Sequence, residues 1–214
     1  PICIDLLDIS YLYLPWISSQ FQEDYINKDK DNYILKYNYE NRLIVRMGYN
    51  YSYNSAGGTL VNNTITTNSY SIRAGFESAG NILYGISKMI NMRKNKDGEY
   101  AILGIPYAQY LKGDFDFAKN IIIDHRNSLA FHAGIGIAVP YGNAKVVPFE
   151  KRYFSGGANS VRGWSVRNLG PGSFAGDGNF MNQSGDIKLD ASIEYRTRLF
   201  QAGGKPHSYV GSSI

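Results

Sequence analysis

The side chains that could do chemistry are few and scattered in this sequence. The three histidines show none of the spacings of a metal site, and Cys3 is the single cysteine, so neither a zinc cluster nor an internal disulfide is expected. The pair Gly134-x-Gly136 lacks the strand-to-helix context of a nucleotide-binding loop. The Gly-x-Ser-x-Gly elbow of serine hydrolases does not occur. The sequence therefore predicts a protein without a catalytic centre, a metal or a cofactor.

The overall composition narrows the class of protein. Hydrophobic residues make up 43% of the 214 residues and charged residues 19%, which is typical of an ordered chain. The 18 tyrosines and 23 glycines favour strands and turns over helices. The net charge of +4 is spread without a Lys/Arg run, so nucleic acid is not an expected partner. No segment suits a leader peptide or a membrane helix, so contact with a membrane would use strands.

The elements that would position a site alternate with a period of two. From Ile187 to Leu199, apolar or neutral side chains alternate with polar and charged ones, which include Asp190 and Glu194. This alternation is typical of antiparallel strands with one hidden face. It occurs in six segments, namely residues 33–40, 42–53, 70–77, 111–117, 129–139 and 187–199. The sequence therefore predicts an all-β protein.

Alternation of this kind is shared by membrane barrels and soluble sandwiches. Strands of about ten residues or more match a tilted membrane strand better than the soluble average of about five or six. The polar faces mix both signs of charge with Gly and Ser, which suits a lumen. Tyrosines lie near strand ends, as in an interfacial girdle: Tyr49, Tyr51, Tyr53 and Tyr107. We therefore predict an antiparallel transmembrane β-barrel, present here as about six long strands.

The segments between these strands differ in character. Residues 54–68 are rich in Asn, Thr and Gly and are expected to form a loop, whereas residues 82–92 suit a short amphipathic helix. Residues 1–30 show no clear alternation, although residues 12–16 could belong to an earlier strand. Residues 141–185 are the longest stretch without alternation and are dense in glycine. Such a stretch is typical of a functional or a disordered loop.

One part of this glycine-dense stretch carries a specific motif. It has a Gly-Gly pair, then Val-Arg-Gly and an aromatic residue: Gly156, Gly157, Val161, Arg162, Gly163 and Trp164. The segment closely resembles the signature loop of the BamA/TamA-type surface-antigen superfamily, in which the aromatic residue is usually Phe or Tyr. The resemblance is dense over residues 107–199, thin before residue 69, and especially close to Bacteroidetes-type members.

The resemblance implies a position for this loop. In the family the loop enters from the extracellular side and folds back into the barrel lumen, which predicts a lumenal segment at about residues 141–186. An arginine placed there loses water, and its burial costs about 3–5 kcal/mol once a partner is removed. Carboxylates are therefore expected beside Arg162. Alternation places four candidates on the lumenal faces, with Glu194 first: Glu194, Asp190, Asp114 and Asp116.

The resemblance also implies a function. Family members insert or translocate other outer-membrane proteins, so the chain is expected to be a non-enzymatic component of the bacterial outer membrane. The expected partners are outer-membrane lipid and lipopolysaccharide, client outer-membrane proteins, and assembly-machinery subunits reached through POTRA domains, which residues 1–214 do not contain. Two alternatives stay open: a pore for two-partner secretion, and the barrel of a patatin-like phospholipase fusion. Because a closed barrel needs at least about eight strands, we expect the chain to be a fragment cut at both ends.

Overall fold

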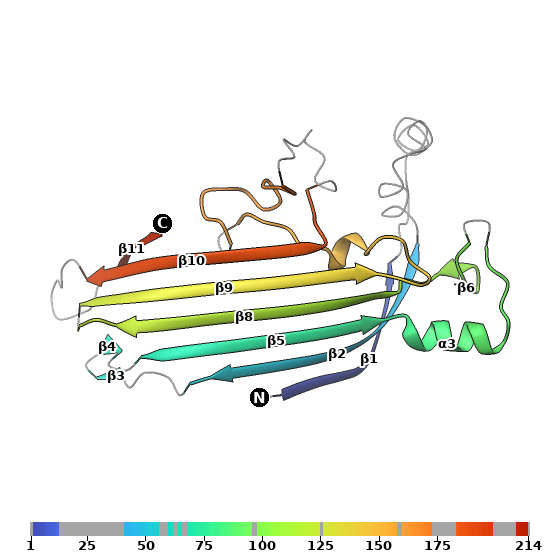
Figure 1. Cartoon of the computed structure of the whole chain (residues 1–214), viewed down its shortest axis with the longest axis horizontal. Coiled ribbons are helices and arrows are strands. Elements are labelled where there is room, and N and C mark those ends of the chain that lie inside the picture. Colours follow the sequence, from blue (N-terminus) through green and yellow to red (C-terminus); the bar gives the residue numbers. More distant parts are fainter. Residues whose placement is uncertain are drawn as a thin grey trace.

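The computed structural model describes residues 2–12, 41–55, 60–61, 64–65, 68–95, 98–124, 126–157, 160–172, 183–198 and 209–213. Most of these residues belong to one antiparallel sheet, in which neighbouring strands follow one another along the chain (Figure 1). The seven strands of the sheet are β1 (Ile2–Leu12), β2 (Arg42–Asn54), β5 (Ser69–Ala79), β8 (Tyr110–Ile122), β9 (Asn127–Pro140), β10 (Ile187–Arg198) and β11 (Tyr209–Ser213). The prediction of an antiparallel all-β fold is confirmed.

The strands can be compared with the predicted segments, none of which covers β1 or β11. Five of the six segments coincide with β2, β5, β8, β9 and β10. The sixth, residues 33–40, lies outside the described residues. The sequence pattern does not predict β1, because a β-bulge between Asp5 and Asp8 breaks its alternation. The two leucines inside the bulge, Leu6 and Leu7, are consequently both exposed.

The other elements are short and lie in the connections between these strands. α3 corresponds to the helix expected at residues 82–92, and β3 and β4 pair inside the segment expected to be a loop. Among the described residues, no helix is long and apolar enough to cross a membrane. The bounds are β3 (Leu60–Val61), β4 (Thr64–Ile65), α3 (Asn81–Met89), β6 (Ala101–Ile102), β7 (Ile105–Pro106) and η2, a 3-10 turn (Phe149–Lys151).

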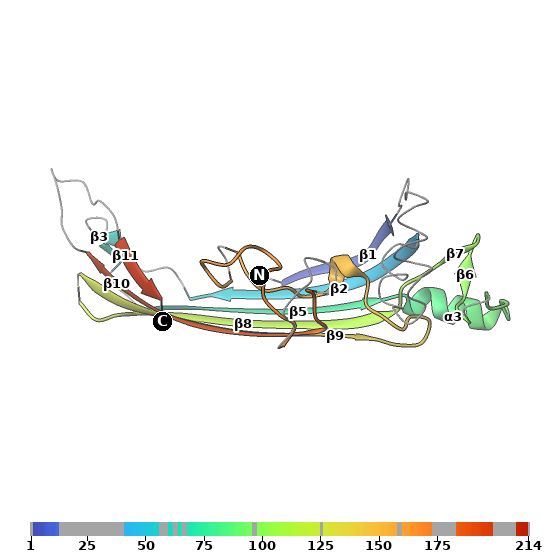
Figure 2. The same cartoon turned by 90° about the horizontal axis from the view of Figure 1, so that it is seen from above.

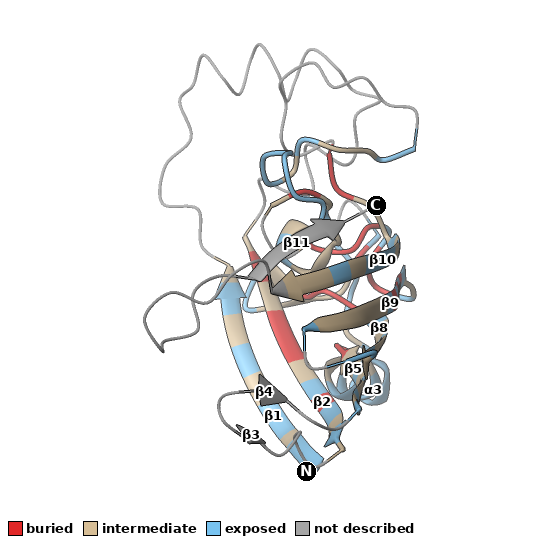
Figure 3. Cartoon of the chain, turned by 90° about the vertical axis from the view of Figure 1, so that its left-hand side faces the viewer, coloured by how far each residue is buried: buried red, intermediate tan, exposed pale blue. Residues whose placement is uncertain are grey.

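The sheet curves into an arc with chemically different faces (Figures 2 and 3). Side chains alternate across a pleated strand, so residues paired in register share a face. One row on the convex face is apolar and runs through Tyr51, Ala74, Phe115, Ile135 and Leu189. The neighbouring row on the concave face runs through Ser52, Arg73, Asp116, Gly134 and Asp190. The arc therefore has the polar interior and apolar exterior of a barrel wall.

The apolar face is open to the surroundings. Phe115 is 45% exposed, Ile135 44% and Leu189 80%, and a continuous apolar surface of this kind is a membrane or partner contact. The six long strands have 11 to 14 residues, enough to span a bilayer at the usual tilt. Lys119 is a charged residue on this face, in register with Tyr70 and Phe131 near the strand ends. Its long side chain can reach the headgroup region from there.

Two residues are buried although their faces are expected outside, Val45 by the alternation of residues 42–53 and Tyr107 as part of the girdle. Val45 is 8% exposed and Tyr107 is fully buried. Both lie where the connection between β5 and β8 runs beside β2, with Tyr107 bridged to Leu43 and the Gly80 N–H donating to the Val45 carbonyl at 2.8 Å. The Tyr107 hydroxyl lies 3.3 Å from Ser87 Oγ in α3, and burial raises the pKa of this tyrosine. Tyr107 is therefore a packing residue rather than part of a girdle.

The two faces can be distinguished with labels on adjacent residues. Ala191 and Ser192 in β10 are both exposed but lie on opposite faces of the sheet. We expect a spin label at position 191 of the full-length protein, as at Met47 or Ile135, to collide with oxygen dissolved in the bilayer. A label at position 192 should instead collide with a water-soluble nickel reagent. Equal access of the nickel reagent to both positions would contradict a lipid-facing outer surface.

Candidate functional site

The described part of the connection between β9 and β10, residues 141–157, 160–172 and 183–186, lies against the concave polar face (Figures 1 and 2). Its two arms are joined where Tyr153 and Gly185 exchange backbone hydrogen bonds of 2.9 and 2.8 Å. Its first arm is packed tightly, and Val146 and Val147 are buried. The loop is thus attached to the wall well before the Gly-Gly pair and the arginine motif are reached.

Tyr153 joins this loop to the wall through several contacts. Its hydroxyl donates to Asp114 Oδ1 at 2.6 Å and lies 3.2 Å from the Gly113 carbonyl. The ring lies directly over Gly136, where an added Cβ would be 2.6 Å from the ring carbons. Lys112 lies on β8, and its Nζ is 4.3 Å from the centroid of the Tyr153 ring. Burial, and then the Asp114 carboxylate, raise the pKa of Tyr153, so its phenol stays a hydrogen-bond donor.

A second contact joins the loop to the first strands of the arc. Lys151 Nζ lies 3.3 Å from Glu77 Oε1 on β5, and the Lys151 carbonyl accepts from Lys112 Nζ at 3.2 Å. Glu77 also accepts from Arg46 Nη1 at 2.7 Å and from the Tyr110 hydroxyl at 2.5 Å. Arg46 in turn donates to Asp8 at 2.7 Å. Charges of both signs are thus paired across β1, β2, β5 and the loop.

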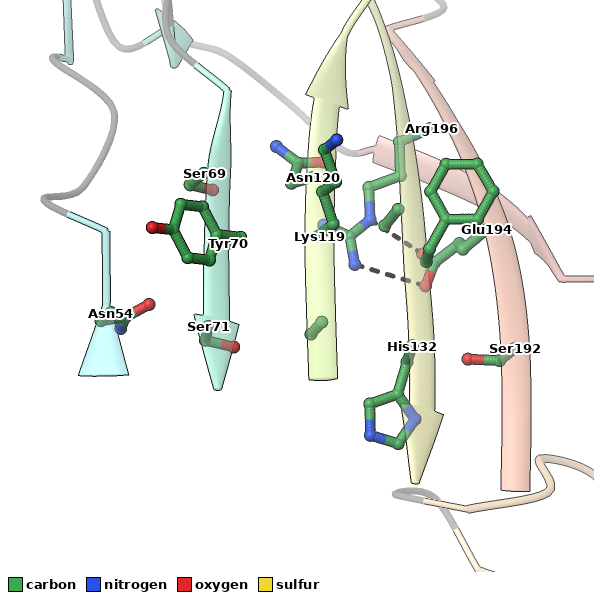
Figure 4. A pocket seen from close by; sticks show the side chains of 13 residues that line it. Asn54, Ser69, Tyr70, Ser71, Lys119, Asn120, His132, Ser192, Glu194 and Arg196 are labelled. Carbon is green, nitrogen blue, oxygen red and sulfur yellow. Dashed lines mark hydrogen bonds and ion pairs between the residues drawn. The ribbon is translucent and has the colours of Figure 1, made fainter. Parts of the chain in front are cut away.

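The expected arginine contact is present but weak. Arg162 Nη2 lies 3.6 Å from Glu194 Oε2, and the Arg162 side chain is 61% exposed. Glu194 is held more closely by Arg196, whose Nε lies 3.1 Å away (Figure 4). Of the four candidate carboxylates, Glu194 is therefore the one within ion-pair distance of Arg162 in the described part of the chain.

The other three candidate carboxylates are engaged elsewhere on the polar face. Asp114 accepts from Tyr153. Asp116 Oδ1 lies 3.2 Å from His132 Nε2, and Asp190 Oδ2 lies 3.4 Å from Lys188 Nζ. Gly134 leaves room for both carboxylates, since an added Cβ would be 2.8 Å from Asp116 Oδ1. The Gly134-x-Gly136 pair therefore makes a recess in the wall.

The signature residues form a folded tip above these anchors. Gly156, Gly157 and Gly163 have positive φ values of 98°, 94° and 88°. At Gly156 a side chain would also meet the Ser165 carbonyl, so this position requires glycine. Val161 and Trp164 are 42% and 51% exposed, so Trp164 does not bury its ring against the neighbouring strand.

A cation–π contact that the sequence does not reveal closes the tip. The guanidinium of Arg167 lies 4.3 Å from the Phe149 ring centroid and 4.8 Å from that of Phe154. The Arg167 N–H also donates to the Ser155 carbonyl at 3.0 Å. The residues that hold the loop are therefore Lys151, Tyr153 and Arg167, and Arg162 lies at its exposed end.

A shallow pocket of about 220 Å³ lies on the concave face toward the short turn between β8 and β9 (Figure 4). His132, Glu194 and Arg196 line it together with Ser and Asn residues. In the described ranges, no group of three or more His, Cys, Asp and Glu residues could hold a metal ion. His125 and His207 lie outside the described residues.

The exposed position of Arg162 changes the effect expected of its substitution. An ion pair at 3.6 Å, in which the Arg162 side chain is 61% exposed, contributes about 0–1 kcal/mol, whereas breaking a buried pair costs more. Arg162→Lys and Arg162→Ala should each change the stability of the full-length barrel, measured by its heat-modifiable migration, by less than about 1 kcal/mol. Tyr153→Ala is the control that should destabilise the loop more. A larger loss with Arg162→Ala than with Tyr153→Ala would show that the arginine is the main anchor.

Comparison with known proteins agrees with this arrangement. Residues 17–213 match the Omp85 superfamily domain. Sixty residues are 37% identical to the outer membrane protein assembly factor BamA of Neisseria meningitidis serogroup B, and this match covers 28% of the chain and 8% of that protein. The family resemblance of the signature loop is confirmed. The strands, the polar-lined arc and the match over most of the chain together show that this protein belongs to the Omp85 superfamily and is a β-barrel protein of the bacterial outer membrane.

Proposed function

We propose that this chain forms part of a barrel that inserts or translocates other outer-membrane proteins, and the neisserial relative, an outer membrane protein assembly factor, supports this proposal. The observation that carries the proposal is the loop held on the polar face by Tyr153 and Lys151, within the region matched to the superfamily. A loop held in this way would let one sector of a barrel keep its shape while the strand pairing of another sector changes.

The contacts give the loop a mechanical role in this proposal. Lys151 reaches Glu77 on β5, and Tyr153 reaches Asp114 on β8 while it covers Gly136 on β9. These three strands are therefore cross-linked on their lumenal side and hold one curvature. A stiff sector confines strand opening to another part of the circumference, where a client strand could pair with an exposed edge. No bond chemistry enters this mechanism, and the signature residues Val161, Arg162 and Trp164 would face the lumen contents.

The proposed partners follow from the same arrangement. Client outer-membrane proteins would pair at the opening, lipid and lipopolysaccharide would contact the apolar face, and assembly-machinery subunits would bind through POTRA domains. A two-partner secretion pore is the main alternative, because it too would carry a lumenal loop. In the first function a client protein enters the membrane, whereas in the second a secreted protein crosses it.

The proposal can be tested with the full-length protein in lipid vesicles. We expect it to accelerate the insertion of an unfolded outer-membrane β-barrel added from outside. Tyr153→Phe combined with Lys151→Met should slow insertion, because a hydrogen bond to a charged group contributes about 1.5–3 kcal/mol. Tyr195→Phe removes a hydroxyl that binds Asn127 on the other face and is the matched control. A protein that conducts solutes but never accelerates insertion would favour the secretion pore.

A further inference from the structure

The helix α3 turns an apolar face outward, whereas a helix packed on a soluble protein turns its apolar face toward the core. Ser87 is fully buried, and its hydroxyl meets that of Tyr107 at 3.3 Å. The face turned outward is apolar, with Ile82 44%, Ile86 47%, Met89 85% and Ile90 62% exposed. Water is a poor solvent for such a face, so another apolar phase or partner must cover it.

A second apolar group is exposed in the same connection. Leu103 is 95% exposed at the tip of the β6–β7 hairpin, and its φ of 51° is a conformation that favours glycine or asparagine. A leucine there gains nothing from packing within the chain. Together with the outward face of α3, it makes an apolar rim at the end of the wall.

The position of α3 continues the lipid-facing surface. The last exposed apolar row before the connection contains Met47, Leu111 and Val139, and Ser78 of β5 shares that row. α3 begins three residues later, after the left-handed turn at Gly80, and extends beyond the end of β5 rather than over the concave face (Figures 1 and 2). Barrel strands are usually tilted by about 35–45°. If α3 continues in that direction from β5, its nine residues rise only about 10 Å above the end of the strand, which keeps the helix next to the headgroup layer.

The charges beside this face have one sign. Lys88, Arg93 and Lys94 are exposed, and the described residues 81–95 contain no acidic side chain. Glu99, the next acidic residue in the described part, is buried against Arg42 at 3.0 Å. An apolar face flanked by basic residues is the pattern of a helix at a lipid surface with anionic headgroups.

We propose that α3 is an interfacial helix, with Ile82, Ile86 and Met89 against the acyl boundary and its basic residues beside lipid phosphates. The membrane face concerned is the one at which residues 141–186 leave the sheet, since both connections lie at the same ends of β5, β8 and β9. This contact would fix the height of the wall in the bilayer. It does not depend on whether the protein assembles other proteins.

The test uses the full-length protein with Cys3→Ser and single cysteines carrying an environment-sensitive dye. Ile86→Cys is the probe, Ile137→Cys is the lipid-facing reference and Glu150→Cys is the water-exposed reference. Vesicles of phosphatidylethanolamine and phosphatidylglycerol contain lipids brominated along their chains. We expect strong quenching at position 86, close to that at 137 and several-fold above that at 150.

The charge requirement is tested in the same vesicles. Lys88→Gln, Arg93→Gln and Lys94→Gln together should lower the quenching at position 86 and leave that at 137 unchanged. Quenching at position 86 as low as at 150 would overturn the proposal, whether water or another protein segment covers the helix. Quenching that the three substitutions leave unaltered would overturn the assignment of a phosphate-bearing lipid surface.

Discussion

Gly136→Ala should push Tyr153 off the wall and release the loop of residues 149–154. A methyl group at position 136 would be 2.6 Å from the tyrosine ring, closer than real contacts allow. The ring cannot shift without leaving Asp114, to which its hydroxyl is bound at 2.6 Å. We expect a loss of about 1–3 kcal/mol in the docking of the loop. Trypsin cleavage after Lys151 or Arg152 in the full-length barrel measures it.

The sheet offers a matched control for this substitution. Gly113 lies on β8, and an added Cβ there meets nothing within 4 Å, so Gly113→Ala should leave the protection of the loop unchanged. The double variant Gly136→Ala with Tyr153→Ala should be no more sensitive than Tyr153→Ala alone, because the clash has gone. Full protection of the loop in Gly136→Ala would mean that Tyr153 is not its anchor.

Glu99→Ala should destabilise the connection between β5 and β8 by about 3–5 kcal/mol, since it removes a carboxylate from a buried arginine. Arg42 Nη1 and Glu99 Oε2 are 3.0 Å apart, and their side chains are 2% and 4% exposed. The pair joins the first residue of β2 to the segment after α3. Hydrogen exchange of residues 80–109 in the full-length protein would report the loss.

A double substitution distinguishes the contribution of the two charges from that of the volume that the side chains fill. Arg42→Met with Glu99→Leu removes both charges and keeps apolar volume, so it should recover much of the lost stability. Exchange rates that stay at the wild-type level in Glu99→Ala would show that the pair contributes little. A double variant less stable than either single variant would show that the charges themselves are needed.

The sheet was largely predictable because each strand shows the period-two alternation within its own sequence. β10 alternates from Ile187 to Arg196 without a break, and the structure pairs this strand with β9 over its length. β1 escapes prediction because the bulge at Leu6 and Leu7 moves the apolar face by one residue, although both halves of the strand alternate. Period-two patterns report a strand only while its register is regular.

The candidate site was predictable only in part, because its contacts join residues far apart in the chain. The motif around Arg162 identifies the loop, and alternation places Glu194 on the same side of the sheet. Neither pattern shows that Tyr153 lies over Gly136 or that Lys151 reaches Glu77. Those contacts depend on the curvature of the wall and on the path of the loop. Asp114 lies on the concave face, but its neighbour there is Tyr153 rather than Arg162.

The anchors of the loop imply that the parts of this wall form in a particular order. β8 ends at Ile122 and β9 begins at Asn127, so few residues separate the two strands and their hairpin can close early. Tyr153 and Lys151, by contrast, find their partners only after β5, β8 and β9 lie side by side. Docking is therefore a late event in biogenesis. The moment at which a newly made chain becomes resistant to trypsin at Lys151 and Arg152 would mark the completion of this sector in the cell.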